Sequence, residues 1–274
     1  MIETDHIEDI RRPKDEGPAR SFDALARVYD AARPGYPEEV YEFIEARKSF
    51  GSASRILEVG AGPGVATREI LDRWNAELIA LEPGRRFCAL LQEKLQGSTK
   101  VRIVNATFEE FMEEGPYDGI FSATAFHWPD PAVKYSKAHH LLADDGLIAL
   151  YWNNFSVAET ALAADIQGIY RKYWPPLEAG YDPITAQRAV IERRKEELES
   201  SGYFALAGHA VFERRLRYGR DCYLALLRTF SDHAAREAAM MENFYNEIGR
   251  IVDDAGGSID VRILVNVELG TKRP

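Results

Sequence analysis

The sequence predicts an α/β fold with a doubly wound, mostly parallel sheet of seven strands, an antiparallel last strand and a helical cap. Three observations support this prediction. Short apolar segments alternate with amphipathic ones over residues 55–154, the first apolar segment stops at clustered glycines, and a strictly alternating segment closes the chain. Nearly continuous apolar strands are typical of parallel sheets covered by helices on both faces.

The first 54 residues lead into this alternation. Residues 1–20 are charged and rich in proline and glycine, which indicates a flexible N-terminal arm. The segment FDALARVYDAA predicts a helix that ends at Arg33, because the residue before a proline avoids helical geometry. A second helix is expected over PEEVYEFIEARKSF, with Val40, Phe43 and Ile44 on one face.

Residues 21–154 are expected to form the core. Its strands are predicted in the segments RILEVG, ELIALEP, VRIVNA, YDGIFSATAF and GLIALYWN, and VATREILDRW and RRFCALLQEKLQ are amphipathic at helical spacing. Residues 155–255 predict a mostly helical cap with a sheet strand near 208–218, and IERRKEELES within it is read as a solvated helical face. Residues 256–274 predict the final strand, antiparallel and at the end of the sheet, with one protected face.

Composition narrows the class of protein. The 274 residues fit one large domain or one domain plus a subdomain. A formal net charge of −10 gives no general attraction to phosphate backbones, so a nucleic-acid partner is not expected. Cys88 and Cys222 cannot form a disulfide framework, and without a Cys/His cluster no metal is expected.

The location and assembly of the protein are predicted less directly. The N-terminus lacks the apolar core of a signal peptide, and no apolar run approaches the ~18 residues of a membrane span. We therefore expect a cytoplasmic protein without a membrane partner. Its oligomeric state is left open between monomer and homodimer.

The turn from Glu58 to Gly64 is the most informative stretch. It follows the first strand, where doubly wound sheets bind ligands. A dinucleotide fingerprint, GxGxxG, would have its third glycine at position 65, where this chain has Val65. Pro63 also removes a backbone amide donor that a pyrophosphate would need. Glu82 ends the second strand and can accept hydrogen bonds from ribose hydroxyls. S-adenosylmethionine, which has a ribose but no phosphate, suits this turn better than a dinucleotide.

The ordered motifs resemble those of class I S-adenosylmethionine-dependent methyltransferases, whose fold is Rossmann-like. The segments that carry the resemblance are LEVGAGPG, LEP, YDGIFSATAFHW and LLADDGLIALYWN. The segments FDALARVYDAARPGYP, YLALLRTFSDH and DDAGGSIDVRILVNVEL are similar to the type 11 and trans-aconitate-methyltransferase-like enzymes, a subgroup that acts on small molecules. The resemblance covers most of residues 21–271, and the ordered set is far more specific than the glycine turn alone.

This resemblance implies a set of cofactor-binding residues. Glu58, Gly60 and Gly62 would line the methionine part, Glu82 would hold the ribose, and Tyr29 with Arg33 would lie over the carboxylate. The remaining positions implied for the cofactor are Ala61, Pro83, Ala106, Thr107, Phe108 and Ala123. Many members carry an acid after the third strand that holds the adenine amino group, and here the nearest matches are Asn105 and Thr107.

The predicted chemistry is in-line transfer of a methyl group to a small-molecule acceptor. Alignment of nucleophile and methyl group is the main requirement, and a general base is needed only when the acceptor must lose a proton. His127 is the first candidate for that base and His233 the second. The side chains expected in the acceptor pocket are Trp128, Tyr151, Trp152 and Asn153.

Two other classes of protein stay open at this point. A nicotinamide-dependent oxidoreductase on a related sheet would also use an acid at position 82, although Val65 in place of the third glycine disfavours it. A non-catalytic module that keeps the cofactor-binding fold is the third possibility, since a glycine turn with its acid predicts binding but not turnover.

Overall fold

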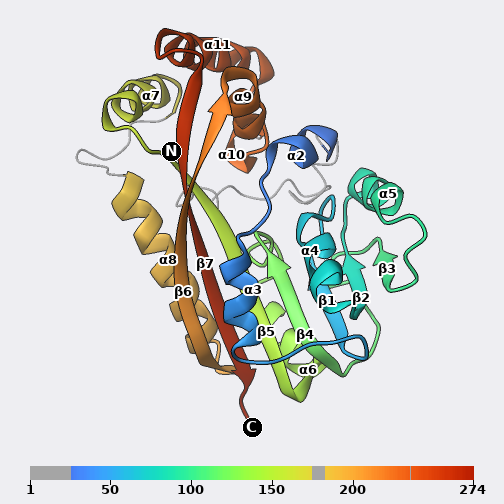
Figure 1. Ribbon diagram of the computed structural model, residues 1–274. Coiled ribbons are helices and arrows are strands. Elements are labelled where there is room, and N and C mark those ends of the chain that lie inside the picture. The colour runs from blue at the N-terminus through green and yellow to red at the C-terminus, as the bar shows by residue number, and fades with distance from the viewer. Residues whose placement is uncertain (1–25, 175–182, 235) are drawn as a thin grey trace.

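Seven strands form one sheet in the order β3-β2-β1-β4-β5-β7-β6 (Figure 1). The structure is a computed structural model that describes residues 26–174, 183–234 and 236–274, so the expected arm over residues 1–20 lies outside the described residues. In chain order the strands are β1 (Arg55–Val59), β2 (Glu77–Leu81), β3 (Val101–Val104), β4 (Tyr117–Ala123), β5 (Leu142–Val157), β6 (Phe204–Gly219) and β7 (Ser258–Lys272).

The pairing of these strands confirms the predicted mixed sheet. Strands β1 to β5 run parallel to one another, and β7 pairs antiparallel with both β5 and β6. The expected position of β7 at the end of the sheet was wrong, because β6 forms the edge beyond it. Asn266 and Glu268 give β7 its alternating pattern, yet both are fully buried and hydrogen-bonded to each other.

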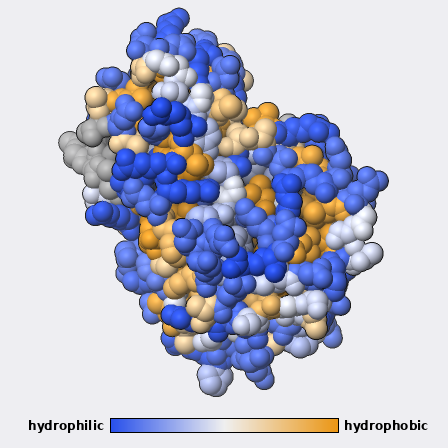
Figure 2. Space-filling model, in the orientation of Figure 1, coloured by the Kyte–Doolittle hydropathy of each residue, from blue (hydrophilic) through white to orange (hydrophobic). Residues whose placement is uncertain are grey.

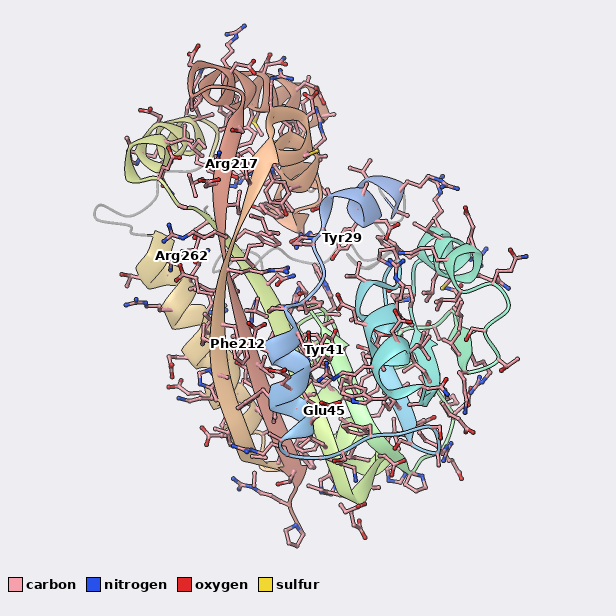
Figure 3. The ribbon with its side chains drawn as sticks, in the orientation of Figure 1. Tyr29, Tyr41, Glu45, Phe212, Arg217 and Arg262 are labelled. Atoms are coloured by element: carbon pink, nitrogen blue, oxygen red, sulfur yellow. The ribbon has the colours of Figure 1, made fainter. Side chains whose placement is uncertain are left out.

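Helices cover both faces of the sheet. The described helices are α2 (Ala26–Ala32), α3 (Glu38–Glu45), α4 (Val65–Trp74), α5 (Arg85–Lys94), α6 (Lys134–Leu141), α7 (Thr160–Tyr173), α8 (Pro183–Ser200), α9 (Arg220–Arg228), α10 (Ser231–Ala234) and α11 (Ala238–Asp254). Ile44 of α3 and Ile70 of α4 are buried in the core cluster on one face, and Ala138 of α6 and Leu198 of α8 in the cluster on the other. Glu45, labelled in Figure 3, joins α3 to α4 by accepting hydrogen bonds from Arg73 and Trp74.

A helical lobe stands above the sheet. Strands β6 and β7 continue past the other strands as a two-stranded ribbon, and α7, α9, α10 and α11 gather around this extension (Figure 1). Arg217 marks the upper part of the ribbon in Figure 3, and Arg262 lies lower on it. Phe155 and Val261 belong to the same buried cluster as Tyr223 and Phe244, so the sheet and the lobe share one core.

Helix α8 differs from the predicted arrangement of the cap. It packs along β6, β7 and β5 instead of joining α7 and α11 in the lobe. The reason lies in its apolar side, where Val190, Ile191 and Leu198 are buried. These residues cover a sheet face, which leaves the lobe to the other helices.

The lead-in helix α2 connects the two parts of the molecule. It contacts α9 of the lobe and α5 beside the sheet. Figure 1 shows it above the carboxyl ends of β1 and β4, where the turns after the parallel strands lie. The surface in this orientation is mostly hydrophilic, with separate hydrophobic patches (Figure 2).

Candidate functional site

A cavity of about 440 Å³ lies at the carboxyl ends of the parallel strands. This volume is within the range of roughly 300–1,000 Å³ that is usual for small-molecule sites. The turns after β1 to β4 line it together with the middle of β5, α2, α8 and the segment that follows α9. Its main lining residues are Tyr29, Arg33, Gly60, Gly62, Glu82, Pro83, Phe87, Ala106, Thr107, Phe108, Glu109, Ala123, Thr124, His127, Trp128, Asp130, Trp152, Asn153, Asn154, Arg193, Arg194, Thr229 and Ser231.

The turn after β1 has glycine at three positions with positive φ. Gly60, Gly62 and Gly64 have φ values of +77°, +56° and +85°, which residues other than glycine rarely adopt. A Cβ atom on Gly60 would lie 2.3 Å from Cβ of Ala125, whereas a Cβ on Gly62 would meet no atom within 4 Å. Gly60 therefore allows close packing of the turn against the segment after β4, and Gly62 faces open space.

The amide groups of this turn are already used inside the protein. Gly60 and Ala61 donate to the carbonyl oxygen of Leu81, and Gly64 donates to that of Ala61. Gly62 donates to Oε2 of Glu82 at 2.8 Å, and Pro63 has no amide hydrogen. A pyrophosphate needs backbone donors at such a turn. The structure therefore supports the inference, drawn from Pro63, that this turn suits S-adenosylmethionine better than a dinucleotide.

Glu82 fixes the relative position of two turns. It is 5% exposed and lines the cavity just after β2. Its Oε2 accepts from the amide of Gly62, and its Oε1 accepts from the amide of Gly84 at 2.7 Å. A carboxylate oxygen can accept more than one hydrogen bond, so these contacts orient the group and leave acceptor capacity for a ligand.

The segment after β3 lines one end of the cavity. Ala106, Thr107 and Phe108 are all among the lining residues. Asn105 is not, since its Nδ2 donates to the carbonyl oxygens of Glu82 and Pro83. The structure instead brings two acids that the sequence analysis missed, Glu109 and Asp130, to this end.

Arg33, which follows α2, is held in place by Thr229 at the end of α9. Its Nε donates to Oγ1 of Thr229 at 2.8 Å, and its Nη2 donates to the carbonyl oxygen of Thr229. The guanidinium lies 5.0–5.2 Å from the ring centroids of Tyr29, Phe155 and Phe230. Arg33 and Tyr29 both line the cavity, and Arg33 also ties the lead-in segment to the end of α9.

Glu58 and Ala61 line a smaller adjoining cavity of about 40 Å³ and not the larger one. Arg33, Gly60 and Gly62 line both cavities. Glu58 is 1% exposed, its Oε2 accepts from the hydroxyl of Thr67, and its Oε1 has no hydrogen-bond partner. Burial raises the pKa of this carboxyl to about 7.

His127 lies in the cavity but is poorly suited to take up a proton. Its Nδ1 accepts a hydrogen bond from the indole Nε1 of Trp152 at 3.3 Å, so the ring hydrogen is on Nε2. Burial and the nearby charges of Arg194, Lys134 and Arg33 lower its pKa to about 3. The free side of this imidazole is therefore a hydrogen-bond donor, which argues against the role expected from sequence.

His233 and Tyr151 do not lie in either cavity, and both expectations need correction. His233 is 2% exposed, and its Nε2 and Nδ1 are bonded to the hydroxyls of Tyr170 and Tyr245. Its burial lowers the pKa to about 3, as expected for a neutral core histidine. Tyr151 is fully buried in the sheet core, because side chains alternate along β5 and its neighbour Trp152 faces the cavity.

Another part of the cavity wall comes from the turn after β4 and from β5. Trp128, Trp152 and Asn153 lie there as expected. Thr124 lies among them and was missed, because its φ of +56° is not readable from a threonine in the sequence. Its Oγ1 contacts the hydroxyl of Tyr36 at 2.8 Å and accepts from the amide of Asn153.

Helix α8 adds two arginines that the sequence analysis assigned to a solvated face. Arg193 and Arg194 both line the cavity. Arg194 stacks on Trp152 with 4.5 Å between its Cζ and the ring centroid. The acids of the cavity lie at the end formed by the turns after β2, β3 and β4. The two arginines come from α8, and Arg194 donates to Asn154 on β5 and to Asn266 on β7. Among the described residues, no group of acidic, histidine or cysteine side chains forms a metal site.

This sheet order, with a donor-poor glycine turn and an acid after β2, defines the class I S-adenosylmethionine-dependent methyltransferase fold. The family described as "Methyltransferase domain" matches residues 56–146. These residues include all but the first residue of β1, the glycine turn, and the whole of β2, β3 and β4. Residues 56–146 therefore match a methyltransferase domain family, and S-adenosylmethionine is the cofactor of class I methyltransferases.

Individual relatives agree with this assignment. An uncharacterised methyltransferase of Mycobacterium bovis is 27% identical over 133 residues, which cover 48% of this chain and 52% of the relative. Malonyl-[acyl-carrier protein] O-methyltransferase 1 of Ilyobacter polytropus is 32% identical over 136 residues, 47% of this chain and 49% of the relative. The match thus spans about half the length of these relatives.

A solved structure extends the similarity of fold over nearly the whole chain. Phosphoethanolamine N-methyltransferase 2 of Haemonchus contortus, in complex with phosphomonomethylethanolamine and S-adenosylhomocysteine, aligns with a TM-score of 0.54. The alignment covers 96% of this chain and 61% of that one at 14% identity. At this identity the similarity concerns the fold. In the described part of this chain, no helix is long and apolar enough to cross a bilayer.

Proposed function

We propose that the chain is an S-adenosylmethionine-dependent methyltransferase that transfers a methyl group to a small-molecule acceptor by in-line displacement. The observation that carries the proposal is the glycine turn, whose amides of Gly60, Ala61, Gly62 and Gly64 are all engaged inside the protein beside Glu82. This arrangement offers a ribose an acceptor and offers a pyrophosphate no set of donors from these residues.

The residues of the cavity fit the parts of this cofactor. Glu82 is available to the ribose hydroxyls, and Phe108 with Pro83 provides an apolar setting for the adenine ring. Arg33, oriented by Thr229, is a suitable partner for the methionine carboxylate, and Glu58 in the adjoining cavity for the ammonium group. When bound, S-adenosylmethionine supplies a methyl group whose transfer leaves a neutral thioether.

Among the described residues, the acceptor side of the cavity offers no ready general base. The imidazole of His127 presents a donor to the cavity, and three cationic side chains disfavour its protonation. The enzyme therefore depends on alignment of the acceptor in a dry cavity, an effect that can contribute ~7–11 kcal/mol. An acceptor that enters already as a nucleophile, without a proton to lose, suits this site.

Calorimetric titration of the protein with S-adenosylmethionine and with S-adenosylhomocysteine tests the cofactor. We expect dissociation constants on the order of micromolar for both. Formation of S-adenosylhomocysteine is then followed with mono-, di- and tricarboxylic acids and with alcohols and amines of the same carbon skeletons. Binding of NADH in place of both sulfur nucleosides would contradict the proposal. Binding without turnover of any acceptor would favour a non-catalytic module.

The role of His127 can be tested with the variant His127→Gln. Its amide keeps a donor near the position of Nε2 but cannot act as a base. Because a general base is worth roughly 10²–10⁴-fold, we expect a loss in kcat of less than about tenfold if His127 only donates a hydrogen bond. The measurement is kcat for an acceptor from the panel at pH 6 to 9. A loss of hundreds-fold, with a pH dependence that the variant lacks, would restore His127 as the base.

A further inference from the structure

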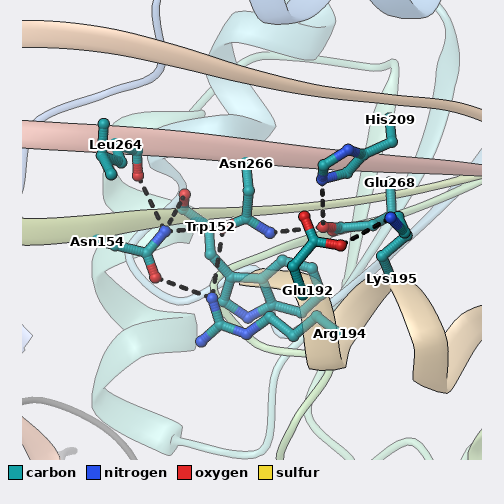
Figure 4. Close-up of polar contacts among 9 residues, drawn as sticks. All are labelled: Trp152, Asn154, Glu192, Arg194, Lys195, His209, Leu264, Asn266 and Glu268. Atoms are coloured by element: carbon teal, nitrogen blue, oxygen red, sulfur yellow. Dashed lines mark hydrogen bonds and ion pairs between the residues drawn. The ribbon is translucent and has the colours of Figure 1, made fainter. Parts of the chain in front are cut away.

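We propose that Arg194 binds a carboxylate of the acceptor and that the buried side chains Glu268, Asn266 and Asn154 hold its guanidinium in position. This inference rests on the proposed function, because it assigns the substrate class of the same cavity. None of these four residues is part of the glycine turn or of the adenosine end of the cavity. Figure 4 shows the contacts that connect them.

The contacts run from the sheet core to the cavity. Asn266 Nδ2 donates to Glu268 Oε1 at 2.8 Å, and Asn154 Nδ2 donates to Asn266 Oδ1 at 2.7 Å. Arg194 Nη1 donates to Asn154 Oδ1 at 2.9 Å and to Asn266 Oδ1 at 3.4 Å. Glu268 and Asn266 are fully buried, and Asn154 is 3% exposed. The chain of contacts thus ends on the one residue of the four that projects from α8.

The carboxylate of Glu268 determines the orientation of both amides. An ionised carboxylate can only accept, so the amide nitrogen of Asn266 must face it. The oxygen of Asn266 then faces Asn154, whose nitrogen also donates to the carbonyl oxygen of Leu264 at 2.9 Å. As a result, two amide oxygens converge on Nη1 of Arg194. A protonated Glu268 can donate instead, which would allow Asn266 to turn its nitrogen toward the guanidinium.

The position of Arg194 suits an anionic acceptor. The guanidinium stacks on Trp152, and the indole of Trp152 donates to Nδ1 of His127. His127 therefore presents Nε2–H in the same cavity, beside the guanidinium. A guanidinium and a neutral N–H donor together match the oxygens of a carboxylate, and planar guanidinium groups bind carboxylates with defined geometry.

A carboxylate also fits the lack of a general base. In the transfer, a carboxylate oxygen forms the bond to the methyl carbon while the carbon–sulfur bond breaks. The electron pair of that bond stays on sulfur, and the products are a methyl ester and S-adenosylhomocysteine. No proton is taken up or released, so the step needs no base from the protein.

The first test measures binding and not turnover. The protein loaded with S-adenosylhomocysteine is titrated with succinate, glutarate, tricarballylate, benzoate and phenylacetate, each compared with its primary amide. We expect at least one acid to bind at least tenfold more tightly than its amide. Arg194→Met should abolish this preference and Arg194→Lys should keep part of it. If no acid is preferred by the wild-type protein, or if Arg194→Met keeps the preference, the assignment is overturned.

The second test separates positioning from a general structural role. The groups that face Glu268 are Asn266 on β7, His209 on β6 with its Nε2 at 3.8 Å, Tyr135 on α6, and Arg194 and Glu192 on α8. Burial raises the pKa of Glu268 to about 7, whereas burial lowers that of His209. Wild-type affinity for the acid should therefore fall about tenfold from pH 8 to pH 6 as Glu268 gains a proton.

Two variants make this pH dependence decisive. Glu268→Gln should bind the acid about tenfold more weakly at pH 8 and should lose the pH dependence. The control Glu192→Gln removes a nearby acid that pairs with Lys195 and contacts neither amide, so it should behave as wild type. If Glu268→Gln keeps wild-type affinity and pH dependence, the positioning role is wrong.

The outcomes also separate this inference from the proposed function. Each variant is first titrated with S-adenosylhomocysteine alone, which should bind as tightly as it does to wild type. Failure of the wild-type protein to bind this nucleoside would contradict the methyltransferase assignment. Normal binding of the nucleoside with no preference for acids would leave that assignment standing and would overturn the role of Arg194.

Discussion

The variant Glu82→Gln should bind S-adenosylhomocysteine on the order of 100-fold more weakly than the wild-type protein, because hydrogen bonds to a charged acceptor contribute ~1.5–3 kcal/mol each. Glu82 accepts the amides of Gly62 and Gly84 on different oxygens. Glutamine replaces one of these oxygens with an NH₂ group that faces an amide donor. The glycine turn then loses its connection to the turn after β2, and the ribose loses its charged acceptor.

Titration calorimetry measures this effect, and thermal unfolding checks that the variant is folded. The matched control is Glu77→Gln, which neutralises an exposed acid at the opposite end of the same strand. That control should keep wild-type affinity. An affinity of Glu82→Gln within threefold of wild type would show that the carboxylate does not contact the ligand.

The variant Glu58→Gln should change how stability depends on pH. Burial raises the pKa of Glu58 to about 7 from its ordinary value of 4.5, so the folded protein binds a proton there that the unfolded chain releases. The free energy of unfolding contributed by this group is therefore highest below about pH 4.5 and falls as the pH rises toward 7. The fall is on the order of 3 kcal/mol, at 1.36 kcal/mol per pKa unit.

Urea unfolding at intervals from pH 5 to 8 measures this effect. Glu58→Gln should show a shallower decline in stability than wild type, because glutamine does not ionise. The control Glu42→Gln changes an exposed acid on α3 and should reproduce the wild-type curve. Identical curves for wild type and Glu58→Gln would mean that Glu58 does not titrate in this range. Glu268, which is also buried with a raised pKa, contributes in the same direction in all three proteins.

The architecture was predictable because its signals are local. The apolar segments from Arg55 to Asn153, the glycine turn and the acid at position 82 each depend on residues close together in the chain. The position of β7 was not predictable in this way. Asn266 and Glu268 alternate with apolar residues as if they faced water. Their burial is explained by their mutual hydrogen bond and by the contacts of Asn266 with Asn154 and Arg194, which come from distant parts of the chain.

The residues of the candidate site also differ in whether local sequence signals or contacts between distant segments place them. The cofactor end follows from the turns after the strands, so Gly60, Gly62, Glu82 and Phe108 were named from sequence. The acceptor end depends on contacts between distant segments. Arg194 is 42 residues from Trp152 in the sequence. It lies in a run of charged residues, which the sequence pattern predicts to be a solvated helical face. The tautomer of His127 and the burial of His233 likewise depend on partners that no local pattern identifies.

The long β6–β7 ribbon limits how a ligand can reach the cavity. A hinge between two parts of a protein requires a few residues that are free to change their backbone angles. Strand β7 is paired with β6 along its whole length and with β5 from Val261 to Thr271. The same continuous, paired strand therefore runs through both the sheet and the lobe. We therefore expect the described lobe to move together with the sheet and not to open about a hinge in β7.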